Sequence, residues 1–297
     1  MKTDPRALKL FLAVCREGTI SGAARSQHLS QPSVSVAISQ LERVLDTKLF
    51  ERRRTGIELT PAGEALHRRA QAMEHLLIAA EREVQLVTEN ITGPLVIGGT
   101  PGALATVVPK ALKLLLSEYP KLDIRIIERK EPSLHELLRT YQLDLAVCTT
   151  AMNECPEDLE ELTILSDSFS LLAGEQNSQL PSEISLTDLQ EVQWVLPDAQ
   201  GSFRRQIDTL FIQSGIPMPA NVIRSDSLLT TKTLVRDTRC ITILPDYVAN
   251  AELAAGQLRA IKIKETGVQR NIGLLWLKER ANGGILQSVI DLLKASH

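Results

Sequence analysis

The chain has 297 residues, of which 43% are hydrophobic and 23% are charged, and its net charge is −3. No run of roughly 18 apolar residues occurs, and the first residues form no hydrophobic signal core, so we expect neither a membrane span nor secretion. The four cysteines, residues 15, 148, 155 and 240, form no Cys-x-x-Cys pair, which is typical of a protein from a reducing cytoplasm. Residues 1–60 carry a net charge of +4 and residues 61–297 a net charge of −7, which favours a polyanion-binding head on an acidic body.

The first 60 residues predict a winged helix-turn-helix domain. Apolar spacing indicates helices over residues 5–17, 20–27 and 32–45, with Pro32 at a first helical position and Ser30 or Gln31 as its cap. Residues 49–52 and 57–60 read as two short strands joined by a basic turn in which Gly56 supplies a positive φ. This order places one helix in a position to enter a DNA groove, with cationic side chains beside it.

Three groups of residues in this head are candidates for DNA contact. The outward face of the third helix is predicted to enter the major groove, where each base pair presents its own pattern of donors and acceptors. The wing arginines are expected at phosphates or in the minor groove, and the second helix start is expected at a phosphate. In that order the candidates are Gln31, Pro32, Ser33, Ser35, Val36 and Ser39; Arg52, Arg53 and Arg54; and Thr19 and Ser21.

Each group also has a purely structural interpretation. Gln31 and the serines would then only cap and solvate their helix, and Thr19 would only be a cap. Arg52 would tie the wing to the helices. Apolar Val36 would contact a thymine methyl group, which favours A·T-rich sites.

A long helix is predicted over residues 61–90, the linker between the head and the rest of the chain. Its apolar residues step by four and three, which is a heptad seam that needs a partner helix. The alternative is an amphipathic helix that lies on its own domain, and the lack of apolar residues elsewhere on the helix argues for the seam. The seam, predicted to form a dimer, consists of Leu66, Ala70, Met73, Leu77, Ala80, Val84 and Val87.

Residues 91–297 alternate between strand and helix patterns, which indicates an α/β domain with a mostly parallel sheet in two lobes. We expect strands at 95–98, 124–128, 143–148, 169–173, 192–196, 221–224, 240–244, 261–264 and 270–277. Helices are expected at 103–119, 133–140, 203–214, 228–237, 246–254 and 284–294. Lobe I would span about 91–164 and 265–297 and lobe II about 165–264, with a ligand cleft between them.

Three motifs together resemble the LysR-type transcriptional regulators: Ala-Ala-x-x-x-x-Leu-Ser-Gln-Pro-Ser-Val-Ser at 23–35, Leu-Phe-Glu-Arg at 49–52 and Leu-Thr-Pro-Ala-Gly at 59–63. In the first 65 residues the resemblance rests on specific motifs, and beyond them it rests on the family's architecture, a linker helix followed by a two-lobed domain. It implies a bacterial, cytoplasmic regulator with an effector domain like the type 2 periplasmic binding proteins. It also implies a homodimer through the linker helix, a homotetramer that bends a longer operator, an RNA polymerase partner and no cofactor. One departure is that a glycine pair frequent in the family is replaced by Asp-Thr-Arg-Cys at 237–240.

Strand ends and helix starts of the two lobes supply the candidate effector residues, because both converge on such a cleft. We expect a small polar or anionic effector there, with Arg204 or Arg205 as a possible partner for an acidic group, although each is more often a solvated helix arginine. As a plain turn, the segment at 98–102 would need no ligand. The candidates are Thr100, Pro101, Gly102, Thr149, Thr150, Ser202, Phe203, Asp226 and Ser227.

Three rival functions are less well supported by the sequence. An α/β enzyme would need a nucleophile–base pair, a metal spacing or a Gly-x-Ser-x-Gly motif, and none is present, so no catalytic or metal-binding residue is predicted. A transport binding protein would not need the head. A redox sensor would use Cys148 and Cys155, which flank a strand end and a loop, but two inert thiols are the simpler interpretation.

Overall fold

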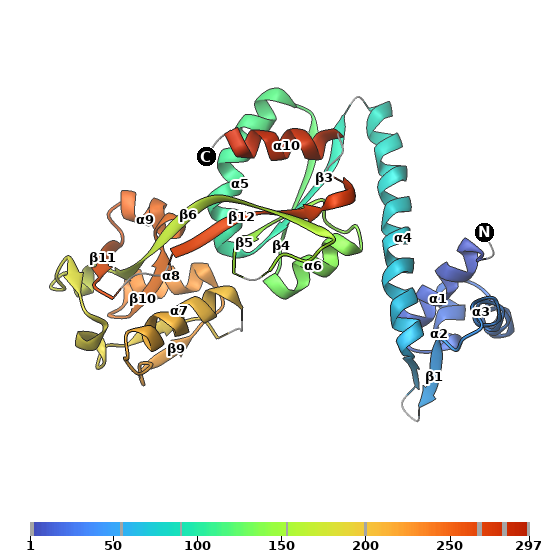
Figure 1. Cartoon of the computed structure of the whole chain (residues 1–297), viewed down its shortest axis with the longest axis horizontal. Helices are drawn as coiled ribbons and strands as arrows, with labels where there is room; N and C mark the ends of the chain where they lie inside the picture. The colour runs from blue at the N-terminus through green and yellow to red at the C-terminus, as the bar shows by residue number, and fades with distance from the viewer. Residues whose placement is uncertain are drawn as a thin grey trace. The chain divides into compact units, whose positions relative to one another are not determined.

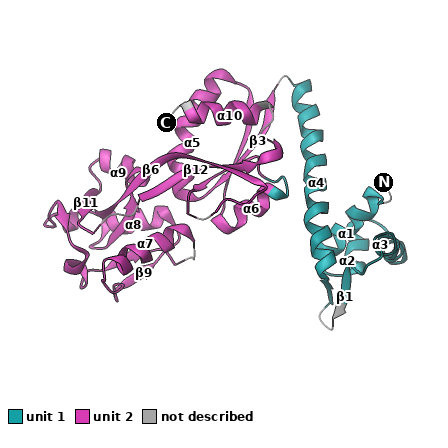
Figure 2. Ribbon diagram, viewed as in Figure 1, with its two compact units in different colours: residues 1–89, 139–142 teal, residues 90–138, 143–297 magenta. Residues whose placement is uncertain are grey.

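Two units divide the chain: residues 1–89 with 139–142, and residues 90–138 with 143–297 (Figure 2). The computed structural model describes residues 3–53, 56–89, 91–152, 154–198, 201–265, 269–280 and 284–295. Within these ranges no helix combines the length and the apolar character needed to cross a membrane.

The first unit is a helical head with a two-stranded hairpin. Its elements are α1 (Pro5–Glu17), α2 (Ile20–Ser26), α3 (Gln31–Leu45), β1 (Phe50–Arg53), β2 (Gly56–Leu59) and α4 (Pro61–Thr88) (Figure 1). Helix α1 ends at Gly18, whose φ of 66° is readily adopted only by a residue without a side chain. The helices share one apolar core in which Phe11 packs against Phe50 with 5.1 Å between ring centroids. The hairpin is therefore fixed to the helices by the same core.

Lobe I of the second unit is built on three parallel strands. Strand β3 (Thr92–Gly99) pairs with β4 (Leu122–Glu128) on one side and with β5 (Leu145–Thr149) on the other. The helices α5 (Pro101–Glu118) and α10 (Gly284–Ala295) pack on this sheet, and α6 (Glu131–Arg139) follows β4. Strand β12 (Gln269–Leu277) joins β5 in the antiparallel direction, so the sheet is mixed.

Lobe II surrounds a second part of the same sheet. Its strands are β7 (Glu183–Ile184), β8 (Trp194–Leu196), β9 (Val222–Arg224), β10 (Ile241–Pro245) and β11 (Arg259–Ile263). Its helices are α7 (Ser202–Gln213), α8 (Leu228–Asp237) and α9 (Asn250–Ala254), with 3-10 turns at Leu186–Leu189 and Asp246–Ala249. Neighbouring residues of a strand face opposite sides, so Leu171 and Leu172 enter two separate cores, one on each face of the sheet.

One long strand joins the lobes. Strand β6 (Leu159–Ala173) pairs with β12 as far as Ser168 and with β10 from Phe169 onward (Figure 1). At this change of partner, Arg270 of β12 stands opposite Asp167 of β6. The two lobes therefore meet where β6 changes its partner, and the paired strands β6 and β12 carry opposite charges there.

Some expectations about the elements were wrong. The sequence predicted only 169–173 as strand, because the first half of β6 is rich in polar residues and many of its residues are only partly buried. The expected mostly parallel sheet is mixed, since β12 and β10 both run antiparallel to β6. The helix expected at 246–254 is a 3-10 turn followed by the short α9. Strand β7 has only two residues and was not predicted.

Candidate functional site

The outward face of α3 is small and mostly polar. Gln31, Pro32, Ser33 and Ser39 are exposed, Ser35 is half-buried, and Val36 exposes 55% of its surface. The opposite face of α3 fills the core of the head with Val34, Ile38 and Leu41. Every residue that sequence analysis assigned to groove contact is therefore at least partly accessible, and none of them is needed for the core.

The candidate Thr19 and the neighbouring Ser30 cap helices with their hydroxyl groups. The Oγ1 atom of Thr19 accepts a hydrogen bond from the backbone N–H of Gly22 at 3.0 Å, at the start of α2. Ser30 caps α3 through the N–H of Ser33, and the hydroxyl groups of the two serines lie 2.7 Å apart. Ser30 rather than Gln31 is thus the cap. Each cap satisfies a backbone N–H in the first turn of its helix, and the phosphate contacts predicted for Thr19 and Ser21 stay predictions.

The wing is attached to the end of α1. The N–H of Ile57 in β2 donates to the carbonyl oxygen of Gly18 at 3.3 Å. The backbones of Arg52 and Arg53 lie in β1, but their side chains lie outside the described residues, as do Arg54 and Thr55 entirely. The predicted phosphate contacts of the three arginines stay predictions.

The end of α3, the start of the wing and the start of α4 pack closely together. The Glu42 carboxylate accepts from the N–H of Leu49 at 3.0 Å and from Nζ of Lys48 at 2.6 Å. Burial alone would raise the pKa of Glu42, but these two donors outweigh it and the pKa is lowered. At Gly63, a Cβ atom would lie 2.1 Å from the carbonyl oxygen of Leu49, so no larger residue fits. This packing sets the direction in which α4 leaves the head.

The predicted seam on α4 divides into two parts. Leu66, Ala70 and Met73 pack into the core of the head itself. Leu77, Val84 and Val87 expose 55%, 70% and 71% of their surfaces, and Ala80 is exposed too. The expectation that apolar residues are missing elsewhere on this helix was wrong, because Leu76 and Ile78 are also exposed. The exposed second half of the seam remains the candidate contact with another helix.

A cavity of about 430 Å³ lies between the two lobes of the second unit. Lobe I contributes the first turn of α5, the end of β5 and residues 128–131 between β4 and α6. Lobe II contributes the first turns of α7 and α8 and the end of β10, and Arg270 comes from β12. Phe203 lines the cavity and stacks on Phe169 with ring centroids 6.3 Å apart. Helix starts and strand ends from both lobes therefore meet at one cavity, as at other ligand sites of open α/β sheets.

Most of the predicted effector residues line this cavity. They are Thr100, Pro101, Gly102, Thr149, Ser202, Phe203 and Asp226. Thr150 does not line it, because its side chain turns to β6, where its hydroxyl lies 2.9 Å from that of Thr163. Ser227 does not line it either, and its hydroxyl caps α8 through the N–H of Thr230.

Two contacts made by neighbouring residues of lobe I cross to lobe II. Lys130 lies 3.5 Å from the carboxylate of Asp226. The carboxylate of Glu131 accepts from both the hydroxyl and the backbone N–H of Ser202 at the start of α7. Sequence analysis missed Lys130 and Glu131, because nothing in a single sequence indicates that the end of β4 faces α7.

The arginines expected to meet an acidic ligand have partners within the protein. Nε of Arg204 donates to Asp208 at 2.7 Å, and its Nη1 donates to the carbonyl oxygen of Pro197 at 2.8 Å. Arg205 donates to the hydroxyl of Ser202 at 3.2 Å. The cation that sequence analysis missed is Arg270, whose side chain is buried in the wall of the cavity. A charged residue at the start of the predicted strand 270–277 was the available signal.

Burial shifts the pKa values of two titratable groups at the point where β6 pairs with β12. Burial lowers the pKa of Arg270, although the nearby carboxylates of Asp167 and Glu131 oppose the shift. Burial raises the pKa of Asp167 to about 6, against the effect of a hydrogen bond from the N–H of Tyr247 at 3.3 Å. Its second oxygen, Oδ1, is buried without a hydrogen-bond partner.

The two cysteines considered for redox chemistry are poorly suited to it. Burial raises the pKa of the Cys148 thiol to about 12, and burial also raises that of Cys155. Both are free thiols, and Cys155 donates to the carbonyl oxygen of Leu159 at 3.6 Å. Oxidation begins from a thiolate, which both environments disfavour.

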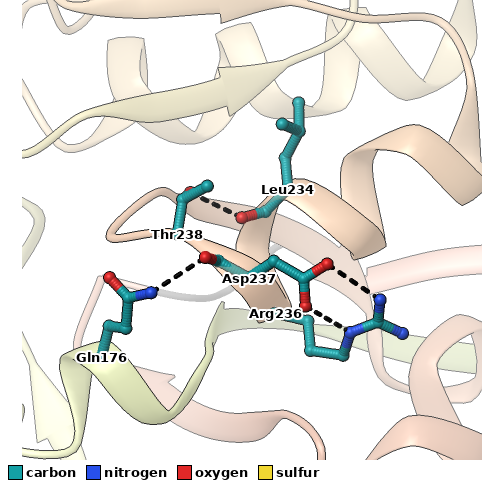
Figure 3. Close-up of polar contacts among 5 residues, drawn as sticks. All are labelled: Gln176, Leu234, Arg236, Asp237 and Thr238. Atoms are coloured by element: carbon teal, nitrogen blue, oxygen red, sulfur yellow. Dashed lines mark hydrogen bonds and ion pairs between the residues drawn. The ribbon is translucent and has the colours of Figure 1, made fainter.

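The segment that departs from the family pattern lies away from the cavity. Figure 3 shows the hydroxyl of Thr238 donating to the carbonyl oxygen of Leu234 at 2.6 Å and Gln176 donating to that of Asp237 at 2.9 Å. Arg236 pairs with the side chain of Asp237 at 2.7 Å. None of these residues lines the cavity, so the departure does not contribute to its wall. In the described part of the chain, no group of three or more His, Cys, Asp or Glu residues could hold a metal ion.

Two protein-family models match this chain. The model of the bacterial regulatory helix-turn-helix protein, lysR family, matches residues 5–64, and that of the LysR substrate binding domain matches residues 88–297. The chain belongs to the LysR family of transcriptional regulators. Membership of this LysR family confirms the predicted fold class, a DNA-binding regulator with an effector domain, and the absence of an enzymatic role.

Individual members of the LysR family are only moderately similar. The transcriptional regulator TdcA of Escherichia coli is 26% identical over 97% of this chain and 91% of its own length. YofA of Bacillus velezensis is 34% identical over 71% of this chain and 70% of its own length. Among solved structures, full-length CbnR in complex with its target DNA has a TM-score of 0.71 at 22% identity and covers 99% of this chain and 100% of its own. A full-length OxyR variant from Pseudomonas aeruginosa has a TM-score of 0.67 at 22% identity over 99% and 94%. At this identity the solved structures support the fold.

Proposed function

We propose that this LysR-family regulator binds an interrupted palindromic operator and that a small polar or anionic molecule between the two lobes alters the geometry of the oligomer on the DNA. The observation that carries the proposal is the interlobe cavity, which is walled by both lobes and contains the buried Arg270. A ligand that touches both lobes changes the free energy of their closed arrangement, which is the physical basis of a switch.

On the DNA, the exposed face of α3 would lie in the major groove. Gln31 is suited to pair with adenine, and the exposed Val36 is suited to contact a thymine methyl group. Ser35 and Ser39 are short and would reach bases or phosphates. The arginines at 52–54 and the start of α2 would contact the backbone of the duplex, which positions the helix without reading sequence.

Assembly would supply a second head. Leu77, Ala80, Val84 and Val87 form an apolar stripe that needs another helix, and a twofold dimer would place two copies of α3 on two half-sites. From family membership we also infer a homotetramer, contact with RNA polymerase and action in the cytoplasm.

Small-molecule binding is favoured over cysteine oxidation as the signal. The raised pKa values of Cys148 and Cys155 keep both thiols protonated at neutral pH. The cavity has a volume within the usual range of about 300–1,000 Å³ for small-molecule sites.

Selection from a random DNA library tests the proposal. The full-length protein is expected to enrich an inverted repeat, because a twofold dimer presents the same helix to both half-sites. Enrichment of a single, unrepeated site would contradict the dimer, and no enrichment at all would contradict sequence-specific binding.

A further inference from the structure

Arg270 of β12 is a buried cation at the point where the two lobes meet. The residue exposes only 4% of its surface, stands opposite Asp167 on β6 and lines the interlobe cavity. A buried charge is costly unless hydrogen bonds and an opposite charge compensate it.

The protein provides few hydrogen-bond partners for this guanidinium group. Among the described residues its one hydrogen bond runs from Nε to Oγ1 of Thr149, at 3.4 Å, and it has no ion pair. Its terminal nitrogens lie beside the first turn of α5, where a Cβ atom on Gly102 would be 3.1 Å from Nη1 and 3.6 Å from Nη2. Four N–H donors of Nη1 and Nη2 are thus left at the wall of the cavity.

The two carboxylates near Arg270 accept hydrogen bonds from other groups, although Oδ1 of Asp167 has no hydrogen-bond partner. Glu131 accepts from the hydroxyl and N–H of Ser202, and Asp167 accepts from the N–H of Tyr247. Asp167 stands opposite Arg270 and attracts it, but neither Asp167 nor Glu131 forms an ion pair with it. The charge of Arg270 therefore lacks a direct counterion within the described residues.

A second unsatisfied group lies in the same wall. Thr100 precedes α5 without making a capping bond, and its Oγ1 is buried without a partner. Thr100 and Gly102 both line the cavity next to Arg270. The start of the 18-residue helix α5 adds unpaired N–H groups and a partial positive charge at this place.

We propose that the cavity binds an organic monocarboxylate whose carboxylate forms paired hydrogen bonds with Nη1 and Nη2 of Arg270 and accepts one from Thr100. This proposal rests on the proposed function, because it names the chemical class of the effector. The planar guanidinium fork matches the two oxygens of a carboxylate. Binding would supply the counterion that Arg270 lacks.

The rest of the wall sets the charge and character of the ligand. Three carboxylates, of Glu128, Glu131 and Asp226, line the cavity together with four cations, Arg129, Lys130, Arg204 and Arg270. Lys130 is paired with Asp226 and Arg204 with Asp208, so the charges of the wall nearly balance and favour a singly charged ligand over a doubly charged group such as a phosphate ester. The other walls are apolar and suit a hydrocarbon body; they include Pro101, Pro197, Phe203, Leu228, Leu244 and Val248.

Thermal unfolding of the full-length protein with three matched probes tests this proposal. Phenylacetate, phenylacetamide and benzylphosphonate share a benzyl group and differ in the head group. Both tryptophans, Trp194 and Trp276, lie in the second unit, so their fluorescence reports on the domain with the cavity. At pH 8 and about 10 mM probe, phenylacetate is expected to raise Tm by about 3 °C, and the amide and the phosphonate by less than about 1 °C. Equal shifts from all three probes, or no shift from phenylacetate, would overturn the proposal.

Two kinds of variant assign the effect to Arg270. Arg270→Lys keeps the charge but loses the fork and is expected to weaken phenylacetate at least about tenfold. Gly102→Ala places a Cβ beside Nη1 and is expected to weaken it about threefold. Gly102→Ala keeps the test valid if Arg270→Lys fails to fold. Unchanged phenylacetate affinity in both Arg270→Lys and Gly102→Ala would overturn the anchor.

Failure of this proposal can be separated from failure of the proposed function. Gly201→Trp would fill the open space at the cavity wall. If phenylacetamide stabilises as strongly as phenylacetate and Gly201→Trp abolishes both shifts, the effector cavity stands and the Arg270 anchor is refuted. Loss of the inverted repeat in the DNA selection would instead refute the proposed function, whatever the probes do.

Discussion

The head and the two-lobed domain differ in how their candidate sites are made. In the head, the exposed residues of α3 come from one stretch of nine residues, 31–39, on a core formed within the same unit. The cavity draws its wall from seven separated stretches of the chain between residues 100 and 270. A surface formed by one helix can change with little effect on folding, whereas the cavity depends on the pairing of β6 with β12. Variants in the two regions are therefore expected to differ in whether they change folding, assembly or binding.

The exposed half of the α4 seam is expected to have the largest effect. The double variant Leu77→Asp with Val84→Asp should dissociate the proposed dimer and weaken operator binding by more than about 1,000-fold, because the two heads are no longer held together. Sedimentation velocity and fluorescence anisotropy measure the two effects. Leu76→Asp, at an exposed position beside the seam, is the control, and a dissociated control would mean that the seam is misassigned.

Val36→Glu should abolish sequence-specific binding without unfolding the head. Val36 is exposed, so its replacement costs little stability, but a carboxylate in the groove faces the phosphates and should weaken binding about 100-fold. Val44→Glu adds the same charge at an exposed position near the end of α3 and should weaken binding much less. Equal losses in the two variants would show that net charge, rather than groove contact, is responsible.

Gly63→Ala should destabilise the head alone. The added Cβ would lie 2.1 Å from the backbone oxygen of Leu49, and relief of this overlap is expected to cost about 3 kcal/mol. Circular dichroism should then show an earlier transition, while the tryptophan fluorescence of the second unit keeps its midpoint. A shift in both signals would mean that the two units unfold together.

Asp167→Asn should change how the stability of the second unit depends on pH. The raised folded-state pKa of about 6 means that the folded protein binds the proton more tightly, so stability falls as pH rises from about 4 to 6. The variant lacks this loss and should gain about 1 kcal/mol relative to the wild type between pH 4 and 7. Urea titrations followed by tryptophan fluorescence measure the gain, and a constant difference across this range would contradict it.

Sequence reasoning located the local features better than the distant ones. The helices and hairpin of the head were predicted because caps, helix periodicity and glycine turns act over a few residues, as at Ser30 and Gly18. Thr100 and Ser202 were found because helix starts are visible in sequence. Thr150 was misplaced because its side chain faces β6, a strand whose first half was not predicted. Arg270 and Glu131 were missed because their surroundings come from distant residues on the other strand or lobe.

A footprint of the selected operator with and without a cavity ligand shows whether the cavity controls the geometry of the protein on DNA. With phenylacetate bound, as shown by its thermal shift, the footprint of the wild-type protein is expected to change in length or in its pattern of enhanced cleavage. That of Gly201→Trp should stay the same with and without the ligand. A wild-type footprint that does not change despite demonstrated binding would contradict the claim that the cavity controls the DNA-bound geometry.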